Sequence, residues 1–256
     1  MSYEQEQVVN IESLDPYAVN AYVARVFGWM FLGLIVTAIT TMAIIYGINV
    51  SDAFANAISG MQQVFFIVVI AELALVFYLS ARITKLQPTT AKLLYIIYAI
   101  SNGFTFGLVA VIVAYGAGMG MQTLGVAFFV AAVSFGIMAV YGLVTKADLT
   151  RFGRLFMMGL IGLIIASVAN IFIRGSMLDL AIIVFGLVLF LGLTAYHTHN
   201  IKHHYARIAL GGDTELFDSN LSREQLGSNL AIIGALQLYL AFINIFFMIL
   251  RLLTRR

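Results

Sequence analysis

Seven long apolar stretches constrain the fold of this chain more than any other feature of its sequence. They cover approximately residues 26–46, 64–80, 91–115, 121–144, 155–173, 178–196 and 229–250. A helix needs about 20 mostly apolar residues to cross a bilayer, and the run at 161–169 lacks the alternation of a membrane barrel strand. With 62% hydrophobic and 10% charged residues, a soluble fold would expose large apolar patches. The sequence therefore predicts an all-α integral membrane protein with seven transmembrane helices.

The basic residues predict how these helices are oriented. Lys and Arg are absent from the connections at 47–63 and 116–120. They are frequent in three alternate connections: Arg82, Lys85 and Lys92; Lys146, Arg151 and Arg154; Lys202, Arg207 and Arg223. Because positively charged loops stay in the cytoplasm, we expect these connections and the N-terminus on the cytoplasmic side. Residues 1–25 are then a polar cytoplasmic tail, and residues 26–256 form the transmembrane domain.

The C-terminus gives conflicting signals. Seven crossings place it outside the cell, yet Arg251, Arg255 and Arg256 lie there, which the positive-inside rule disfavours. The last stretch either crosses completely or re-enters and returns to the cytoplasmic side. Its length of about 22 residues is that of a full span, which favours crossing.

Composition and motifs exclude several classes of function. A net charge of +2 gives no basic field for nucleic acid, and the chain has no Cys for thiolate chemistry. It has no nucleophile-elbow, zinc-protease or P-loop motif, so we expect neither an enzyme nor a bound cofactor. No internal repeat is evident, which weakens a transporter interpretation without removing it.

Glu72 is the acidic residue at the centre of an apolar stretch. A carboxylate at this depth is costly, faces the interior of a helix bundle and usually marks an ion or proton pathway. The alternative is a structural role, in which a protonated Glu72 hydrogen-bonds to a neighbouring helix. Asn102, Asn170 and Asn244 are candidate partners for that bond.

The last apolar stretch carries a polar stripe. Gly234, Gln237, Ala241 and Asn244 are spaced i, i+3, i+7 and i+10, so they share one face of a helix. Such a face points into a bundle or a water-filled cavity. The stripe either lines a pathway or joins helices through hydrogen bonds, and the sequence favours neither.

All four histidines lie between positions 197 and 204, after the sixth stretch: His197, His199, His203 and His204. An i, i+4 pair such as His199 and His203 can bind a metal, but no Asp or Glu is near in sequence and we predict no metal site. Imidazoles can instead sense pH, or act as cations favoured at a helix C-terminus. His197 is closest to the membrane and is our candidate for a functional histidine.

Four segments resemble the Bax inhibitor-1 family, most closely its bacterial inner-membrane branch. They are 22–33 (YVARVFGWMFLG), 146–162 (KADLTRFGRLFMMGLIG), 190–202 (FLGLTAYHTHNIK) and 234–251 (GALQLYLAFINIFFMILR). The resemblance runs from about residue 20 to the C-terminus. It implies six helices surrounding a central C-terminal seventh, and a calcium leak that is sensitive to pH. It also implies a pair of aspartates, on the sixth and seventh helices, which titrate together.

This chain departs from the family at both aspartates. The sixth-helix position is His197 and the seventh-helix position is Ala241, so the carboxylate pair cannot form. Glu72 matches an acidic position of the second helix in some members. Arg82 lies near a basic residue that latches to the aspartates in some members, and it is a candidate latch here although its partners are gone.

We therefore expect a membrane ion pathway for calcium ions or protons in the bacterial inner membrane, with Glu72, His197, Gln237, Ala241 and Asn244 at its gate. The resemblance to the bacterial branch also implies an alternative, in which the chain is a non-conducting modulator of a membrane-bound AAA protease. The acidic N-terminal tail would then be the contact surface. A small-solute transporter is a third and weaker interpretation.

Overall fold

All regular elements in the part of the chain that the structure describes are helices. The computed structural model describes residues 15–59, 62–112, 120–210 and 222–255. The helices are α1 (Pro16–Val50), α2 (Asp52–Ser59), α3 (Gln62–Arg82), α4 (Pro88–Val111), α5 (Gly120–Val144), the short 3-10 helix η3 (Leu149–Phe152), α6 (Gly153–Ile173), α7 (Ser176–Leu210) and α8 (Arg223–Thr254). The predicted all-α fold is therefore confirmed.

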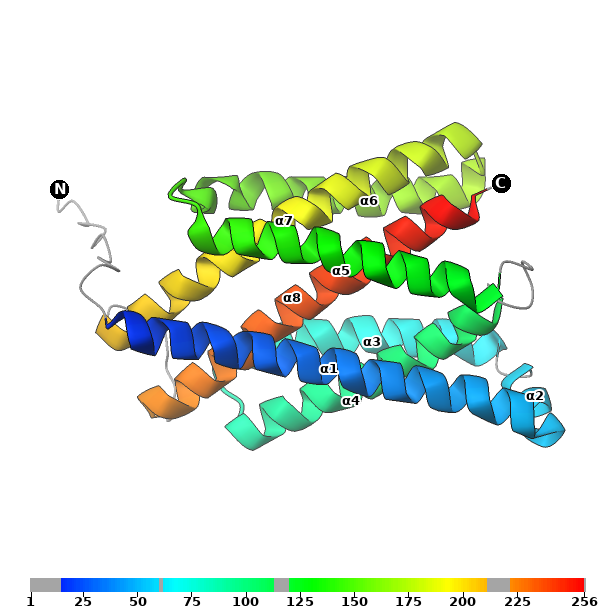
Figure 1. Ribbon diagram of the computed structural model, residues 1–256, viewed down its shortest axis with the longest axis horizontal. Helices are drawn as coiled ribbons and strands as arrows, with labels where there is room; N and C mark the ends of the chain where they lie inside the picture. The colour runs from blue at the N-terminus through cyan, green and yellow to red at the C-terminus, as the bar shows by residue number, and fades with distance from the viewer. Residues whose placement is uncertain (1–14, 60–61, 113–119, 211–221, 256) are drawn as a thin grey trace.

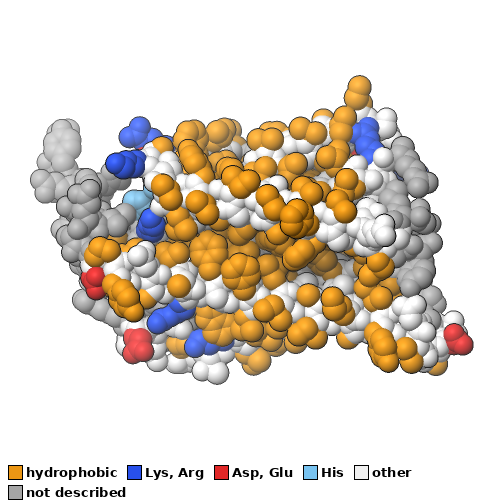
Figure 2. All heavy atoms as spheres, viewed as in Figure 1, with side chains coloured by type: hydrophobic (Ala, Val, Ile, Leu, Met, Phe, Trp, Pro, Cys, Tyr) orange, Lys and Arg blue, Asp and Glu red, His pale blue; other side chains and the backbone are white. Residues whose placement is uncertain are grey.

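The long helices lie side by side along the longest axis of the molecule (Figure 1). α1 and α8 begin at one end of the bundle and finish at the other, and α7 runs the opposite way (Figure 1). Among the described residues, six helical stretches are long and apolar enough to cross a membrane, namely α1, α4, α5, η3 with α6, α7 and α8. Figure 2 shows hydrophobic side chains over the middle of one face and charged ones near its two ends. The chain is a multi-pass membrane protein.

α8 is the most buried of these six helices. In its most apolar stretch 78% of the residues are buried, against 6% in the η3–α6 stretch. α8 packs against α1, α4, α5 and α7. α3 packs mainly on α4, and α6 packs mainly on α7 and η3. The side chains of α8 therefore meet four helices directly.

Several helices are longer than the apolar stretches that predicted them. α1 begins at Pro16, where the Asp15 carboxylate accepts a hydrogen bond from the Tyr17 amide at 3.0 Å, so residues 16–25 of the predicted tail are helical. Residues 1–14 of that tail lie outside the described residues. α7 continues to Leu210, well past the predicted end at 196, because the histidine segment extends the helix. Polar residues end a membrane-spanning stretch without ending a helix.

A single glycine sets the close packing of α5 on α7. A Cβ at Gly142 would lie 2.4 Å from the carbonyl oxygen of Ala195 and 2.9 Å from its Cα. Both of these atoms belong to the backbone, so neither can move aside as a side chain would. Only glycine allows the two helices to approach this closely.

Candidate functional site

Glu72 lies on α3 with its carboxylate turned toward α4. The residue is 9% exposed, although it lies in the middle of a helix with many lipid-exposed neighbours such as Ile70 and Leu73. Its Oε1 accepts a hydrogen bond from Ser101 at 3.0 Å and one from Thr105 at 2.8 Å. The structure thus supplies two hydroxyl partners, rather than the asparagine amides that the sequence suggested.

These two hydroxyls are placed by the period of a helix. Ser101 and Thr105 are four residues apart on α4, so they lie one above the other on the same face. A hydrogen bond to a charged group contributes about 1.5–3 kcal/mol, and both bonds reach one carboxylate oxygen. Glu72 is therefore held inside the bundle by α4.

A second polar cluster joins α1, α4 and α8. The Tyr239 hydroxyl of α8 is fully buried and lies 2.7 Å from the Thr37 hydroxyl of α1. The Thr37 hydroxyl is also 3.0 Å from the Ala99 carbonyl oxygen of α4. The Tyr98 ring meets the Tyr239 ring edge-on, with centroids 5.7 Å apart. Because hydroxyls both donate and accept, such a cluster can relay a proton.

The two clusters are close enough to influence each other electrostatically. The Glu72 carboxylate is within range to interact electrostatically with both Tyr98 and Tyr239. Tyr98 is 5% exposed and Tyr239 is fully buried, so little water screens this interaction. Polar groups therefore extend from α3 through α4 to the centre of α8.

The predicted stripe on α8 has mixed surroundings. Gln237 and Asn244 are half-buried, whereas Ala241 is buried at 3% exposure. The Asn244 side-chain amide donates to the Leu240 carbonyl at 2.8 Å, one turn earlier in its own helix. The Asn244 N–H is therefore used locally and does not join α8 to a neighbour through this bond.

Asn229 is a buried polar residue that sequence reasoning missed. It is fully buried in α8, and its amide nitrogen donates to the carbonyls of Ile83 at 2.8 Å and Leu86 at 2.7 Å. Its side-chain oxygen is buried and has no hydrogen-bond partner in the described part of the chain. Asn229 ties the start of α8 to the turn between α3 and α4. The sequence signal that could have found Asn229 is an amide side chain at the start of the last apolar stretch, 229–250.

His199 and Lys202 of α7 contact the end of α5. The His199 ring is hydrogen-bonded to the backbone of Gly142, and the Lys202 amine donates to the Leu143 carbonyl at 2.5 Å. Both acceptors belong to the last turn of α5, whose carbonyls lack partners within the helix. The sequence suggested that the histidines could act as cations at the C-terminus of their own helix, but α7 continues past them to Leu210, and it is the end of α5 that His199 and Lys202 contact.

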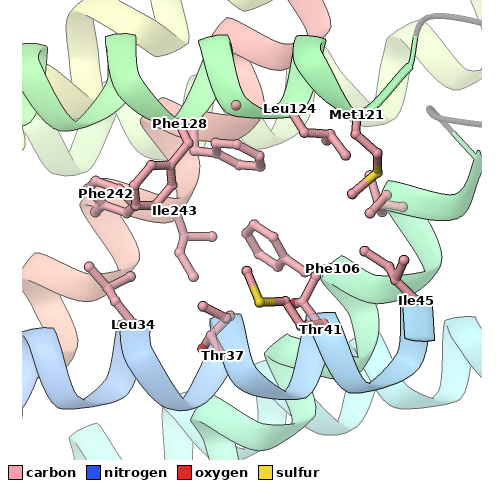
Figure 3. Close-up of a pocket in the computed structure, with 16 residues that line it drawn as sticks. Leu34, Thr37, Thr41, Ile45, Phe106, Met121, Leu124, Phe128, Phe242 and Ile243 are labelled. Atoms are coloured by element: carbon pink, nitrogen blue, oxygen red, sulfur yellow. The ribbon is translucent and has the colours of Figure 1, made fainter. Parts of the chain in front are cut away.

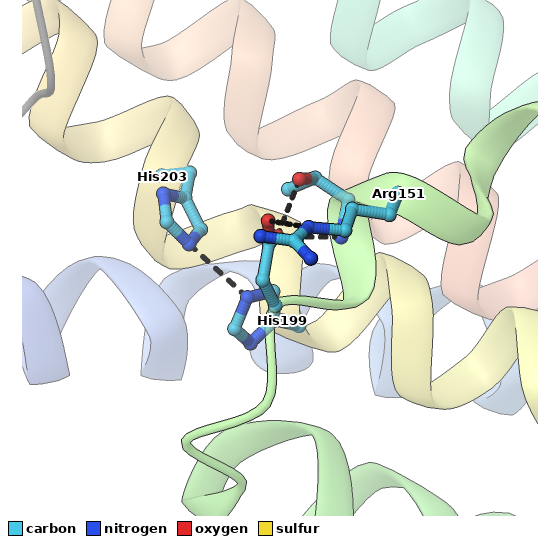
Figure 4. Close-up of polar contacts among 5 residues, drawn as sticks. Arg151, His199 and His203 are labelled. Atoms are coloured by element: carbon cyan, nitrogen blue, oxygen red, sulfur yellow. Dashed lines mark hydrogen bonds and ion pairs between the residues drawn. The ribbon is translucent and has the colours of Figure 1, made fainter.

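The His199 and His203 rings face each other. Their Nε2 atoms are 3.2 Å apart and their ring centroids 4.8 Å apart (Figure 4). Within the described ranges, no three His, Asp or Glu side chains come together in a way that could hold a metal ion. His197 lies two residues before His199 in α7 and is half-buried, and its ring centroid is 5.4 Å from that of the Tyr196 ring. The side chain of His204 lies outside the described residues.

Asp148 lies in the loop beside this histidine pair. It accepts hydrogen bonds from the Thr150 amide at 3.0 Å, from the Thr150 hydroxyl and from Arg151 Nε at 3.2 Å. These bonds, those of Thr150 above all, hold the pKa of the Asp148 carboxyl below its usual value of 3.8. The loop therefore keeps a stable negative charge close to His199.

Arg82 lies too far along α3 from Glu72 to form a latch with it. It is the last residue of that helix and is exposed. Ten residues separate it from Glu72, which is about 15 Å along a helix. The two side chains therefore lie at different levels of the bundle.

The C-terminal arginines have partners at the start of α7. Arg251 forms an ion pair with Asp179, and Asp179 also accepts a hydrogen bond from Asn170 at 3.4 Å. Arg255 donates to the Ser176 carbonyl. Asp179 is in the first turn of α7, where a negative charge is favoured. The positive charges at this end of the bundle are thus partly neutralised within the protein.

Comparison with known proteins confirms the family suggested by the four sequence segments. The family described as "Inhibitor of apoptosis-promoting Bax1" matches residues 19–256. The inner membrane protein YbhL of Escherichia coli (strain K12) is 36% identical over 238 residues, which are 93% of this chain and 92% of YbhL. An uncharacterized protein of Deinococcus radiodurans is 35% identical over 97% of this chain and 96% of its own length. An uncharacterized membrane protein of Streptococcus pyogenes is 29% identical over 92% of this chain and 93% of its own length. The chain therefore belongs to the Bax inhibitor-1 family.

Proposed function

We propose that this protein is a membrane ion pathway that conducts calcium ions or protons past Glu72. The proposal is carried by the Glu72 carboxylate, which is 9% exposed, lies in the middle of α3 and is bound by Ser101 and Thr105. Ionisable side chains within a membrane are costly, and they typically mark ion or proton pathways.

The chemistry around Glu72 suits both ions. Calcium prefers oxygen ligands, and the Glu72 carboxylate with the Ser101 and Thr105 hydroxyls provides three oxygen-bearing side chains side by side. Protons need groups that donate and accept, which the hydroxyls of Tyr239 and Thr37 supply at 2.7 Å from each other. Both ions would enter the bundle between α3, α4 and α8.

The gate of this pathway differs from that of family members with an aspartate pair. His197 and Ala241 occupy the aspartate positions, so two negative charges that attract a divalent cation are missing. We propose that calcium binds more weakly here than in such members. Titration of the His197 imidazole replaces that of the aspartates as the pH-sensitive step, and Gln237 and Asn244 line the path on α8.

We further propose seven crossings in the bacterial inner membrane, with the N-terminus in the cytoplasm and α8 as the central helix. α3 supplies the seventh crossing, because its 21 residues extend about 31 Å, the thickness of the hydrocarbon core. The C-terminal arginines then lie outside, where the ion pair of Arg251 with Asp179 reduces their conflict with the positive-inside rule. The relative YbhL is named an inner membrane protein, which supports this location.

Flux measurements on Glu72→Gln test the proposal. Gln keeps the size of the side chain and an oxygen for the two hydroxyls, but it removes the charge. In liposomes loaded with a calcium or pH indicator, we expect the variant to conduct at least roughly tenfold less than wild type, because it has lost the negative charge that attracts a cation in surroundings with little water.

A matched control is Glu224→Gln, which removes an exposed carboxylate from the first turn of α8. We expect it to conduct as wild type does. Deletion of residues 1–14 should also leave the flux unchanged, whereas modulation of a protease through the acidic tail would be lost. Equal flux for Glu72→Gln and wild type would refute the role of Glu72.

A further inference from the structure

An apolar groove opens between α1 and α5 on the side of the molecule. Its volume is about 340 Å³, and residues of α1, α4, α5 and α8 line it (Figure 3). Met42 of α1 is among the lining residues. Figure 3 shows Met121 of α5, Phe106 of α4 and Phe242 of α8 around the groove. The groove therefore reaches from the surface to the central helix.

The lining offers almost nothing but hydrocarbon. None of the side chains that line the groove is charged. Its two hydroxyl groups already bond to carbonyls of α4: Thr37 to Ala99 at 3.0 Å and Thr41 to Gly103 at 3.0 Å. A bound water needs two to four polar partners, and an ion needs charged or oxygen-rich surroundings. Water and ions are therefore unsuitable occupants.

The groove is continuous with the lipid-facing surface. Met42 is 69% exposed, Met121 49% and Phe128 52%, and all three line the groove. Beyond these walls, Ile39 of α1 and Phe129 of α5 are 63% and 69% exposed on helices that can cross a membrane. Figure 2 shows hydrophobic side chains spread across this face. The groove is thus a recess in a surface that lipid chains cover.

We infer that this groove binds one acyl chain of a membrane phospholipid. The uncharged lining matches an uncharged alkyl chain, and the opening faces the layer that contains such chains. A volume of about 340 Å³ holds roughly ten groups of the size of a water molecule or a methylene, which is a large part of one acyl chain. In a bilayer such binding depends on close van der Waals packing, which the Phe106 and Phe242 rings provide. The bound chain rests directly on α8.

Two glycines of α5 allow a matched test. Gly125 lines the groove, whereas Gly136 is outside it, and a Cβ built at either position meets nothing within 4 Å. Gly125→Phe therefore fills the groove, and Gly136→Phe adds the same side chain to the same helix elsewhere. Ala38→Phe fills the groove from α1 and serves as a second variant, since Ala38 lines the groove and is exposed.

The probe is a phosphatidylethanolamine with a photoreactive diazirine in one acyl chain, mixed into phosphatidylethanolamine–phosphatidylglycerol vesicles that contain the purified protein. Peptides are mapped after illumination. We expect wild type and Gly136→Phe to be labelled preferentially at groove residues such as Phe106 and Phe242. Both Gly125→Phe and Ala38→Phe should lose that labelling and keep the labelling of other lipid-facing residues.

Labelling of Phe106 and Phe242 that persists in both filled variants would overturn the inference, as would its absence from wild type. The mass of the purified protein in detergent tests for another occupant, a second copy of the chain. If wild type were a dimer and both filled variants were monomers, the groove would belong to a dimer interface and the inference would also be overturned. The ion flux is measured on the same vesicles. The flux tests the ion pathway at Glu72, whereas the labelling tests the groove, so the two proposals can fail separately.

Discussion

Removing the Asn229 amide should weaken the bundle more than removing any other amide of α8. Asn229→Ala deletes two hydrogen bonds, to the carbonyls of Ile83 and Leu86. A buried hydrogen bond contributes about 0.5–1.5 kcal/mol, and those between membrane helices average about 0.6 kcal/mol. The deletion leaves two carbonyls without this donor, and it also removes the partnerless Asn229 oxygen. We expect a loss of about 1–3 kcal/mol, or roughly 2–12 °C in Tm.

The control for this prediction is Asn244→Ala. It removes the same amide from the same helix, but this amide donates to the Leu240 carbonyl within α8. We expect a loss below about 0.5 kcal/mol, because surface-like and local bonds contribute little. The assay is thermal unfolding of both purified variants in one detergent, followed by circular dichroism. If the two variants lost equal stability, the reasoning that Asn229 fastens α8 to the α3–α4 turn would be refuted.

Two further predictions concern α5 and the loop that follows it. Gly142→Val places a Cβ 2.4 Å from the Ala195 carbonyl oxygen and should lower Tm sharply or prevent folding. The control is Gly162→Ala, where a Cβ meets nothing within 4 Å; it should leave Tm unchanged or raise it slightly. Equal effects of the two substitutions on Tm would contradict the close packing of α5 on α7. The hydrogen bonds of Thr150 are the main cause of the lowered pKa of the Asp148 carboxyl. The ionised carboxyl therefore stabilises the folded protein above the ordinary pKa of 3.8, and this contribution is lost as the pH falls through the lower pKa of the folded state. As the pH falls from about the ordinary value of 3.8 through the lower folded value, wild type should therefore lose stability more steeply than Asp148→Asn. Parallel acid-unfolding curves would contradict this.

The long helices could be predicted from apolar length alone, whereas the short helices α2 and η3 lie in stretches predicted as connections. The stretch at 121–144 became α5 at Gly120–Val144, and the stretch at 64–80 became α3 at Gln62–Arg82. Lipid requires every backbone group to be paired, so a long apolar run has almost no alternative to a helix. The end of α7 was missed because a helix can continue beyond the membrane, where hydropathy no longer reports on it.

The polar partners could not be predicted in the same way. Glu72 stood out because a carboxylate is rare among apolar neighbours, but its partners Ser101 and Thr105 are ordinary residues of an apolar helix. Their role depends on how α4 is rotated against α3, which the spacing within one helix does not determine. The same holds for Thr37 and Tyr239, which lie 202 positions apart in the chain. Packing between helices selects such pairs.

Ion flux through the wild-type protein tests the central claim most directly. Purified protein is reconstituted into liposomes that contain calcium-sensitive or pH-sensitive dyes, and flux is followed between about pH 6 and pH 8, the range in which histidine titrates. The account predicts a calcium or proton leak above that of empty vesicles, which changes across this range and falls in Glu72→Gln. A flux equal to that of empty vesicles at every pH would contradict it.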